Sequence, residues 1–239
     1  MILRRIFPGE PESIDLADAS SRPRLLELYR PPRAEWLRLN LITTVSGSAS
    51  GSDGTSETLT NAADRRLLGV IRELSDVVLI GANSLRTEGY LLPKRSRLAV
   101  VTSSGNLAGH SVNQNAETDA VVVLCPASAV HRVRESLGSV RADVVEIADT
   151  GGRMSPVDIV SALRSLGLAS IVCEGGPSLA AQLLLAGVVD ELCLATSPVL
   201  NGAALAPFGR EYIEAKRLSL RQLMVDDESG LYARWAVAQ

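Results

Sequence analysis

The fold is decided by the stretch Ile171-Val172-Cys173-Glu174-Gly175-Gly176-Pro177-Ser178. Its apolar residues predict a buried strand over 170–173, the two glycines predict a tight turn, and the residues that follow predict a helix over 178–186. A buried strand that passes through a short turn into a helix is the repeating unit of an α/β protein.

The same unit recurs on both sides of this stretch. Unbroken runs of Val, Ile and Leu predict further buried strands at 76–81, 98–102, 120–124, 143–147 and 191–196. Helices are expected over 127–137, over 156–166 with Ser155 as its cap, and after Thr60 or Asn61, where Asp64 has capping-box spacing. Strands buried on both faces are typical of a mostly parallel sheet covered by helices on both sides.

The two ends of the chain differ from this pattern. Residues 1–35 contain five prolines and are expected to form an irregular N-terminal arm, with one short helix over 24–29. Residues 36–239 are expected to form a single domain, in which a strand over 36–45 leads into a flexible loop over 46–56. Alternating apolar residues at 217–225 and 231–237 predict an antiparallel hairpin that closes one edge of the sheet.

The composition excludes several classes of function. The chain has 24 Lys and Arg against 27 Asp and Glu, so no excess of cations is available for a nucleic-acid backbone or an acidic membrane. No segment has the continuous apolar length of a signal peptide or a membrane span, and we therefore expect a cytoplasmic protein without nucleic-acid or membrane partners. Cys125, Cys173 and Cys193 lie in apolar runs and are interpreted as reduced core thiols.

Small and polar residues follow three of the predicted strands, where ligands collect in sheets of this kind. The turn Gly175-Gly176 precedes a helix N-terminus, which favours phosphate, although the glycines alone fit a purely structural turn equally well. Gly81-Ala82-Asn83-Ser84 repeats the design, and two such strand ends indicate one dinucleotide. Thr102-Ser103 is more often an ordinary turn, but here it is a candidate for an adenosine phosphate.

An ordered set of motifs over residues 36–237 resembles the pyrimidine reductase domain of riboflavin biosynthesis. The set comprises the helix over 65–73 and the segments 76–84, 174–179, 189–192 and 197–202. The resemblance implies a dihydrofolate-reductase-like fold, NADPH as hydride donor, a homodimer, and reduction of 5-amino-6-(5-phosphoribosylamino)uracil to its ribityl form. It also implies that the domain over 36–239 is the reductase domain.

The resemblance assigns site residues position by position. The dinucleotide would be lined by Gly81, Ala82, Asn83, Ser84, Glu174, Gly175, Gly176, Pro177, Ser178 and Leu179. Thr102 and Ser103 would face the adenosine phosphate, with Arg86 or Arg97 as a nearby cation, and Asn40, Thr44 and Ser46 would border the nicotinamide and the substrate. Glu174 contacts either ligand or caps the following helix.

The chain departs from the family pattern at two places. Ser46-Gly47 stands where the family usually has Asp-Gly, and Asn83-Ser84 stands where it commonly has Gly-Thr. We expect the first change to affect the choice of substrate more than the binding of NADPH, unless Asp53 supplies the missing carboxylate from the loop.

Other features limit the chemistry that the sequence predicts. His110 and His131 are the only histidines, so no zinc deaminase signature can be assembled and no metal is expected. Both histidines are interpreted as surface residues, and the sequence indicates no catalytic acid. A pterin or dihydrofolate reductase, and an NADPH-binding redox sensor without turnover, remain alternative functions.

Overall fold

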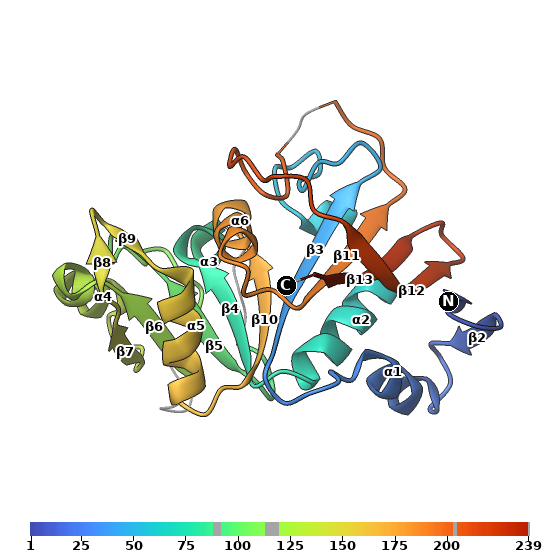
Figure 1. Ribbon diagram of the computed structural model, residues 1–239, viewed down its shortest axis with the longest axis horizontal. Helices are drawn as coiled ribbons and strands as arrows, with labels where there is room; N and C mark the ends of the chain where they lie inside the picture. The colour runs from blue at the N-terminus through green and yellow to red at the C-terminus, as the bar shows by residue number, and fades with distance from the viewer. Residues whose placement is uncertain (88–91, 113–119, 203–204, 239) are drawn as a thin grey trace.

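The computed structural model describes residues 1–87, 92–112, 120–202 and 205–238. Figure 1 shows these residues built around one long sheet. The strands are β1 (Ile2–Phe7), β2 (Glu12–Asp15), β3 (Trp36–Thr44), β4 (Val77–Gly81), β5 (Arg97–Val101), β6 (Val121–Cys125), β7 (Asp143–Glu146), β8 (Asp149–Thr150), β9 (Arg153–Met154), β10 (Ser170–Gly175), β11 (Glu191–Ser197), β12 (Leu218–Asp226) and β13 (Leu231–Val237). The helices are α1 (Ser21–Tyr29), α2 (Ala62–Glu73), α3 (Ala82–Thr87), α4 (Val130–Leu137), α5 (Pro156–Ser165) and α6 (Pro177–Leu185), with short 3₁₀ turns η1 (Glu57–Leu59) and η2 (Ala127–Ala129).

The sheet is mostly parallel. Within the described residues its strand order is β2-β1-β12-β13-β11-β3-β10-β4-β5-β6-β7, and β8 pairs with β9 separately. The strands from β11 to β7 in this order are parallel to one another, while β13, β12, β1 and β2 are paired antiparallel. The predicted fold class, a mostly parallel α/β sheet with a C-terminal antiparallel hairpin, is therefore confirmed.

Helices cover both faces of the sheet because the central strands are apolar on both. In β4, Val78 and Ile80 belong to a core cluster that also contains residues of α1, α2, α3 and α4, whereas Val77 and Leu79 belong to the cluster that contains residues of α5 and α6. Successive side chains of a strand point to opposite faces, so one apolar run contributes to two cores. This placement leaves the carboxyl ends of β3, β4, β5 and β10 together at one rim of the sheet.

The predicted helix starts are present. Asn61 precedes α2 and its side-chain oxygen accepts a hydrogen bond from the Asp64 amide at 2.9 Å, and Ser155 accepts from the Asp158 amide at 3.5 Å before α5. Each side chain satisfies an N–H group that the first helical turn leaves without a backbone acceptor. Pro177 begins α6, where the missing proline N–H costs nothing.

The expectation of irregular structure across residues 1–35 is wrong. β1 pairs with β12 and carries β2 on its outer side, and α1 begins at Ser21, before the predicted Arg24. The C-terminal hairpin consequently lies inside the sheet and does not form its edge. The partner of Leu3 is Asp226, more than 200 residues away, and no local pattern specifies a pairing at such a distance.

A buried ionic cluster joins the N-terminal segment to the sheet. Glu191 accepts hydrogen bonds from the guanidinium groups of Arg38 and Arg234 and from the Trp36 indole. Arg38 also donates to the Tyr29 carbonyl at the end of α1, at 2.8 Å. The pKa of Glu191 is lowered, because burial alone would raise it but the two arginines outweigh that effect.

The three thiols are part of the core. Cys125, Cys173 and Cys193 are free and buried, as predicted. Burial raises the pKa of Cys173 and of Cys193 to about 12, which keeps both as unreactive thiols near neutral pH.

Candidate active site

The turn between β10 and α6 has a backbone that requires glycine. Gly175 has a φ of +108°, which other residues rarely adopt, and its peptide bond to Gly176 is cis. Gly176 is the N-cap of α6 and offers no side chain to the helix, so the amides of Ser178 and Leu179 lack an acceptor within it. Two N–H groups and the positive end of the helix dipole are therefore available to an anion.

The turn also packs closely against the end of β4. A Cβ atom added to Gly176 would lie 3.1 Å from the Ser84 hydroxyl oxygen, and one added to Gly81 would lie 3.7 Å from the Gly176 nitrogen. Ser84 itself is 5% exposed and lies beneath the turn, not in a cavity wall. Small residues at both strand ends thus allow the two backbones, and a ligand beside them, to approach closely.

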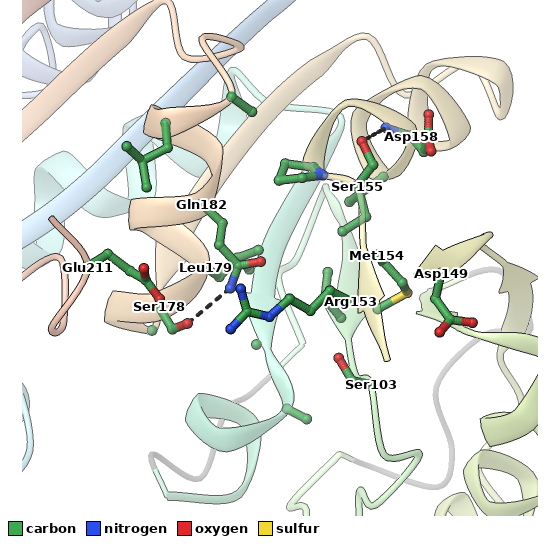
Figure 2. Close-up of a pocket in the computed structure, with 18 of the residues that line it drawn as sticks. Ser103, Asp149, Arg153, Met154, Ser155, Asp158, Ser178, Leu179, Gln182 and Glu211 are labelled. Atoms are coloured by element: carbon green, nitrogen blue, oxygen red, sulfur yellow. Dashed lines mark hydrogen bonds between the residues drawn. The ribbon is translucent and has the colours of Figure 1, made fainter. Parts of the chain in front are cut away.

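A cavity of about 980 Å³ opens on one side of this turn (Figure 2). Its walls come from the ends of β4 and β5, from the β8–β9 hairpin, from the start of α5, from α6 along its length, and from Glu211. Of the residues expected to bind the dinucleotide, those that line this cavity are Gly81, Ala82, Asn83, Ser103, Gly176, Pro177, Ser178 and Leu179. Its volume is large enough for a dinucleotide.

Thr102 does not face this cavity. Its side chain is 3% exposed, and its hydroxyl accepts a hydrogen bond from the Gly105 amide at 3.0 Å. The hydroxyl therefore holds the turn after β5, whereas the neighbouring Ser103 reaches the cavity.

The cation in the cavity wall is Arg153, which sequence reasoning missed. Figure 2 shows its side chain extending from β9 across the cavity toward α6, and within the described part of the chain it has no ion-pair partner. Arg97, one of the two expected cations, lies at the amino end of β5 and pairs with Asp143 at 2.5 Å, so it is at the wrong end of the strand. Arg86, the other, donates to the Asn106 carbonyl.

A local signal for Arg153 was present in the sequence. Gly151 and Gly152, both with positive φ, follow Asp149-Thr150 and form the turn of the β8–β9 hairpin. A two-glycine turn flanked by short polar strands predicts such a hairpin. What the pattern does not contain is the direction in which the hairpin points.

A second cavity, of about 610 Å³, opens on the other side of the turn. It shares Gly176 and Pro177 with the first cavity, so the two meet at the glycine turn. Its remaining walls are Asn40, Leu41, Ile42, Ala49, Thr55, Ser56, Glu57, Thr60, Asp64, Arg65, Leu68, Arg72, Thr87, Glu174, Gly175, Leu205 and Pro207. Asn40, one of the residues expected at the substrate, therefore lines this second cavity.

Glu174 belongs to this second cavity. Its carboxylate accepts two hydrogen bonds from Arg72, from Nε at 2.7 Å and from Nη2 at 2.6 Å, and its side chain is 8% exposed. Burial lowers the pKa of Arg72, but the hydrogen bonds and charge of Glu174 outweigh it and the net pKa is raised. The carboxylate makes no cap on α6, so the capping interpretation of Glu174 is wrong.

Thr44 and Ser46, expected at the substrate, lie outside both cavities. Ser46 donates to the Asn201 carbonyl at 2.8 Å and lies 2.9 Å from the Thr44 hydroxyl, which ties the loop after β3 to the segment after β11. Asp53 does not replace the missing family carboxylate, because it accepts hydrogen bonds from Thr55 and Thr58 and lines neither cavity.

Asp64 is the cavity residue that sequence reasoning recognised only as part of a helix cap. Three carboxylates line the second cavity, and two of them are paired: Glu57 with Arg65 and Glu174 with Arg72. The Asp64 carboxylate has no hydrogen bond or ion pair among the described residues. Burial raises its pKa to about 6, Arg65 opposes the shift, and the negative charge of Glu174 adds to it.

Other site types are absent from the described ranges. No group of three or more His, Cys, Asp or Glu side chains there is arranged to hold a metal ion. None of the helices in the same ranges has the length and apolar character of a membrane span. His110 is half-buried and His131 is exposed, and both lie outside the two cavities.

Solved structures with the same fold are known. A pyrimidine reductase-like protein of Corynebacterium diphtheriae is 24% identical, with a TM-score of 0.68 over 86% of this chain and 92% of that one. A deaminase/reductase of Thermotoga maritima (17% identity, TM-score 0.69) matches over 85% of this chain but only 56% of its own. The riboflavin biosynthesis reductase of Saccharomyces cerevisiae (15% identity, TM-score 0.62) matches over 90% of this chain and 99% of its own.

Sequence comparison identifies the family. The riboflavin biosynthesis protein RibD of Chlamydia pneumoniae is 25% identical over 219 residues, which are 85% of this chain and 55% of that protein. The chain thus spans about half the length of this curated relative. The family model of the RibD C-terminal domain matches residues 35–231. With that match over most of its length, and with the fold expected of such a domain, the chain belongs to the RibD C-terminal domain family.

Proposed function

We propose that this protein is an NADPH-dependent reductase of the riboflavin-pathway type, which reduces 5-amino-6-(5-phosphoribosylamino)uracil to its ribityl form. The observation that carries the proposal is the pair of cavities that meet at Gly176 and Pro177 in a chain of this family. A reductase must hold a cofactor and a substrate face to face, and two cavities that share one wall allow this.

The first cavity suits the dinucleotide. The amides of Ser178 and Leu179 at the start of α6 would receive the pyrophosphate, as at other phosphate-binding helix N-termini. The adenosine end would extend toward Ser103 and Arg153, where a guanidinium favours the 2′-phosphate that distinguishes NADPH from NADH. The nicotinamide would then lie at the shared glycine turn, and NADPH supplies the hydride when bound.

The second cavity suits a polar heterocycle. The Asn40 amide provides a donor and an acceptor, and Glu174, fixed by Arg72, provides acceptor oxygens for ring N–H and amino groups. Because Arg72 holds the carboxylate in one orientation, little ordering is needed when the substrate binds.

NADPH oxidation distinguishes this function from its alternatives. We expect turnover with the ribosylated aminopyrimidine and not with dihydrofolate. Efficient oxidation with dihydrofolate alone would identify a pterin-type reductase, and NADPH binding without oxidation by either compound would identify a sensor.

The role of Arg153 is tested by cofactor preference. Arg153→Ser should weaken NADPH binding about tenfold to a hundredfold, the equivalent of one charge-assisted interaction, and leave NADH binding unchanged. Arg97→Ser is the matched control, because it removes an arginine at the far end of β5. If Arg153→Ser retains full NADPH preference in fluorescence titrations, the 2′-phosphate lies elsewhere.

We also propose a homodimer, as the family resemblance implies. Val45, Val199 and Leu200 expose apolar side chains on two loops that are joined by a hydrogen bond from the Val45 amide to the Val199 carbonyl. A second copy that covers this surface would remove it from water. Leu200→Glu should shift the sedimentation of the protein from dimer to monomer, and an unchanged dimer would place the interface elsewhere.

A further inference from the structure

One carboxyl group in the second cavity, that of Asp64, forms no hydrogen bond or ion pair with the described residues. Asp64 lies in the first turn of α2 and lines the cavity together with Asn40 and Glu174. In the part of the chain that the structure describes, no donor or cation contacts its carboxylate, whereas Glu57 and Glu174 each have an arginine. An unpaired carboxylate in a largely enclosed position is unfavourable unless a ligand or a proton compensates it.

From this placement we propose that Asp64 is the proton donor of the reduction. The inference rests on the proposed function and names the acid that the reaction requires. In this chain Ser46 stands where the family usually has a carboxylate, and Asp53 does not enter the cavity. Asp64 would supply the carboxyl group that neither of these residues provides.

The surroundings of Asp64 raise its pKa from the ordinary value of 3.8 toward neutral pH. Its pKa of about 6 reflects burial first, and the charges that act on it are mixed. The titratable and charged groups around it come from five elements: Arg65 and Arg72 on α2, Glu57 on η1, Glu174 on β10, Asp226 on β12 and Tyr232 on β13. A general acid is most effective when its pKa lies close to the working pH, and a bound substrate that excludes water would raise the pKa further.

The chemical step balances with this donor. In the ring-opened substrate, C1′ and the exocyclic nitrogen form an imine. Hydride adds to C1′ with its electron pair, the π electrons of the C=N bond move to nitrogen, and nitrogen takes the proton from Asp64. The imine is reduced to a secondary amine, NADPH is oxidised to NADP⁺, and the Asp64 carboxylate regains a proton from water.

The competing explanation is structural, because acidic residues are common in the first turn of a helix, where they complement the helix dipole. Asp158 holds the equivalent position in α5, three residues after the cap of that helix. It therefore serves as a reference for how much a first-turn carboxylate stabilises the protein. Thermal unfolding of Asp158→Asn and of Asp64→Asn therefore measures what loss of a first-turn charge does to stability alone.

The deciding experiment measures single-turnover reduction of the pyrimidine by the full chain with NADPH between pH 5.5 and 9. Asp64→Asn should lose about a hundredfold to ten-thousandfold in rate, bind NADPH with an affinity within twofold of the natural protein, and lose the decline of rate at alkaline pH. Asp64→Glu should recover part of the rate together with that decline. If Asp64→Asn does not fold, Asp64→Glu decides: a folded variant whose rate shows no alkaline decline overturns the assignment.

A second measurement reads the proton directly. The infrared difference between the natural protein and Asp64→Asn should contain a protonated carboxyl band that titrates near pH 6, whereas a midpoint near 4 would refute the proposal. If the natural protein reduces the pyrimidine and Asp64→Asn does so equally well, Asp64 is not the donor while the proposed function stands. If the natural protein binds NADPH but fails to reduce the pyrimidine, the proposed function fails and the role of Asp64 fails with it.

Discussion

Replacing Gly176 with aspartate tests the assignment of the α6 N-terminus to the pyrophosphate. Gly176 is the N-cap, and an aspartate there would accept hydrogen bonds from the amides of Ser178 or Leu179, the groups we assign to the cofactor. Its charge would also lie roughly 5 Å from a phosphate. At an effective dielectric constant of about 20, two unit charges at that distance repel by about 3 kcal/mol.

The expected result is a loss of NADPH affinity of at least about a hundredfold in Gly176→Asp. Gly176→Asn is the matched control, since it has the same shape and the same capping ability but no charge. Gly176→Ala controls for size, because its Cβ lies 3.1 Å from the Ser84 hydroxyl, which must move by a few tenths of an ångström. Both controls should bind NADPH within about tenfold of the natural protein.

Isothermal titration at a fixed ionic strength near 0.15 M measures these affinities, and thermal unfolding shows that each variant is folded. The reasoning is refuted if folded Gly176→Asp binds NADPH as tightly as Gly176→Asn. In that case the turn serves only backbone geometry, and the dinucleotide site must be sought elsewhere.

Three further predictions concern stability. Because the folded-state pKa of Asp64 lies above its ordinary value of 3.8, the free energy of unfolding should fall as pH rises from about 4 to 6. At pH 8 the free energy of unfolding of Asp64→Asn should therefore be about 1–2 kcal/mol higher than that of the natural protein, and at pH 4 it should not be higher. Glu191→Gln should lower the free energy of unfolding by about 3–5 kcal/mol in urea, because it leaves Arg38 and a second buried arginine uncompensated. Since the pKa of Glu191 is lowered on folding, its own contribution should be present above pH 4.5 and decline at lower pH, and a flat profile would contradict this. Ser46→Asp should cost about 1–3 kcal/mol and leave turnover unimproved, because a carboxylate cannot donate to the Asn201 carbonyl; improved turnover would restore Ser46 as a substrate residue.

Local sequence predicted the parallel half of the sheet well. The runs around Val77–Gly81 and Val121–Cys125 contain enough adjacent apolar residues to be buried on both faces in any compact fold. Asn61 and Ser155 cap helices through groups only three residues away. Such features depend on near neighbours along the chain, so they can be predicted without a structure.

The N-terminal strands at the antiparallel edge of the sheet could not be predicted in this way. β1 has two arginines between its apolar residues, and it becomes a strand because β12 presents free backbone groups beside it. The two ionic partners of Glu191 likewise come from β3 and β13, which are far from it in sequence. Pairings of this kind depend on the register of a completed sheet.

The sequence by itself determined the α/β class, the glycine turn at 175–176 and the strand ends that surround it. Only the tertiary structure decided which side chains enter the two cavities: Arg153 and Asp64 do, whereas Thr102 and Ser46 do not. The physical reason is that strand and helix periodicity determines the face on which a residue lies, whereas the direction of a loop side chain depends on hydrogen bonds to distant segments. For Ser46 that distant partner is Asn201. Asp64 lies in the first turn of α2, and it lines the cavity because α2 meets residues of β3 and β10 there, a packing that only the tertiary structure shows.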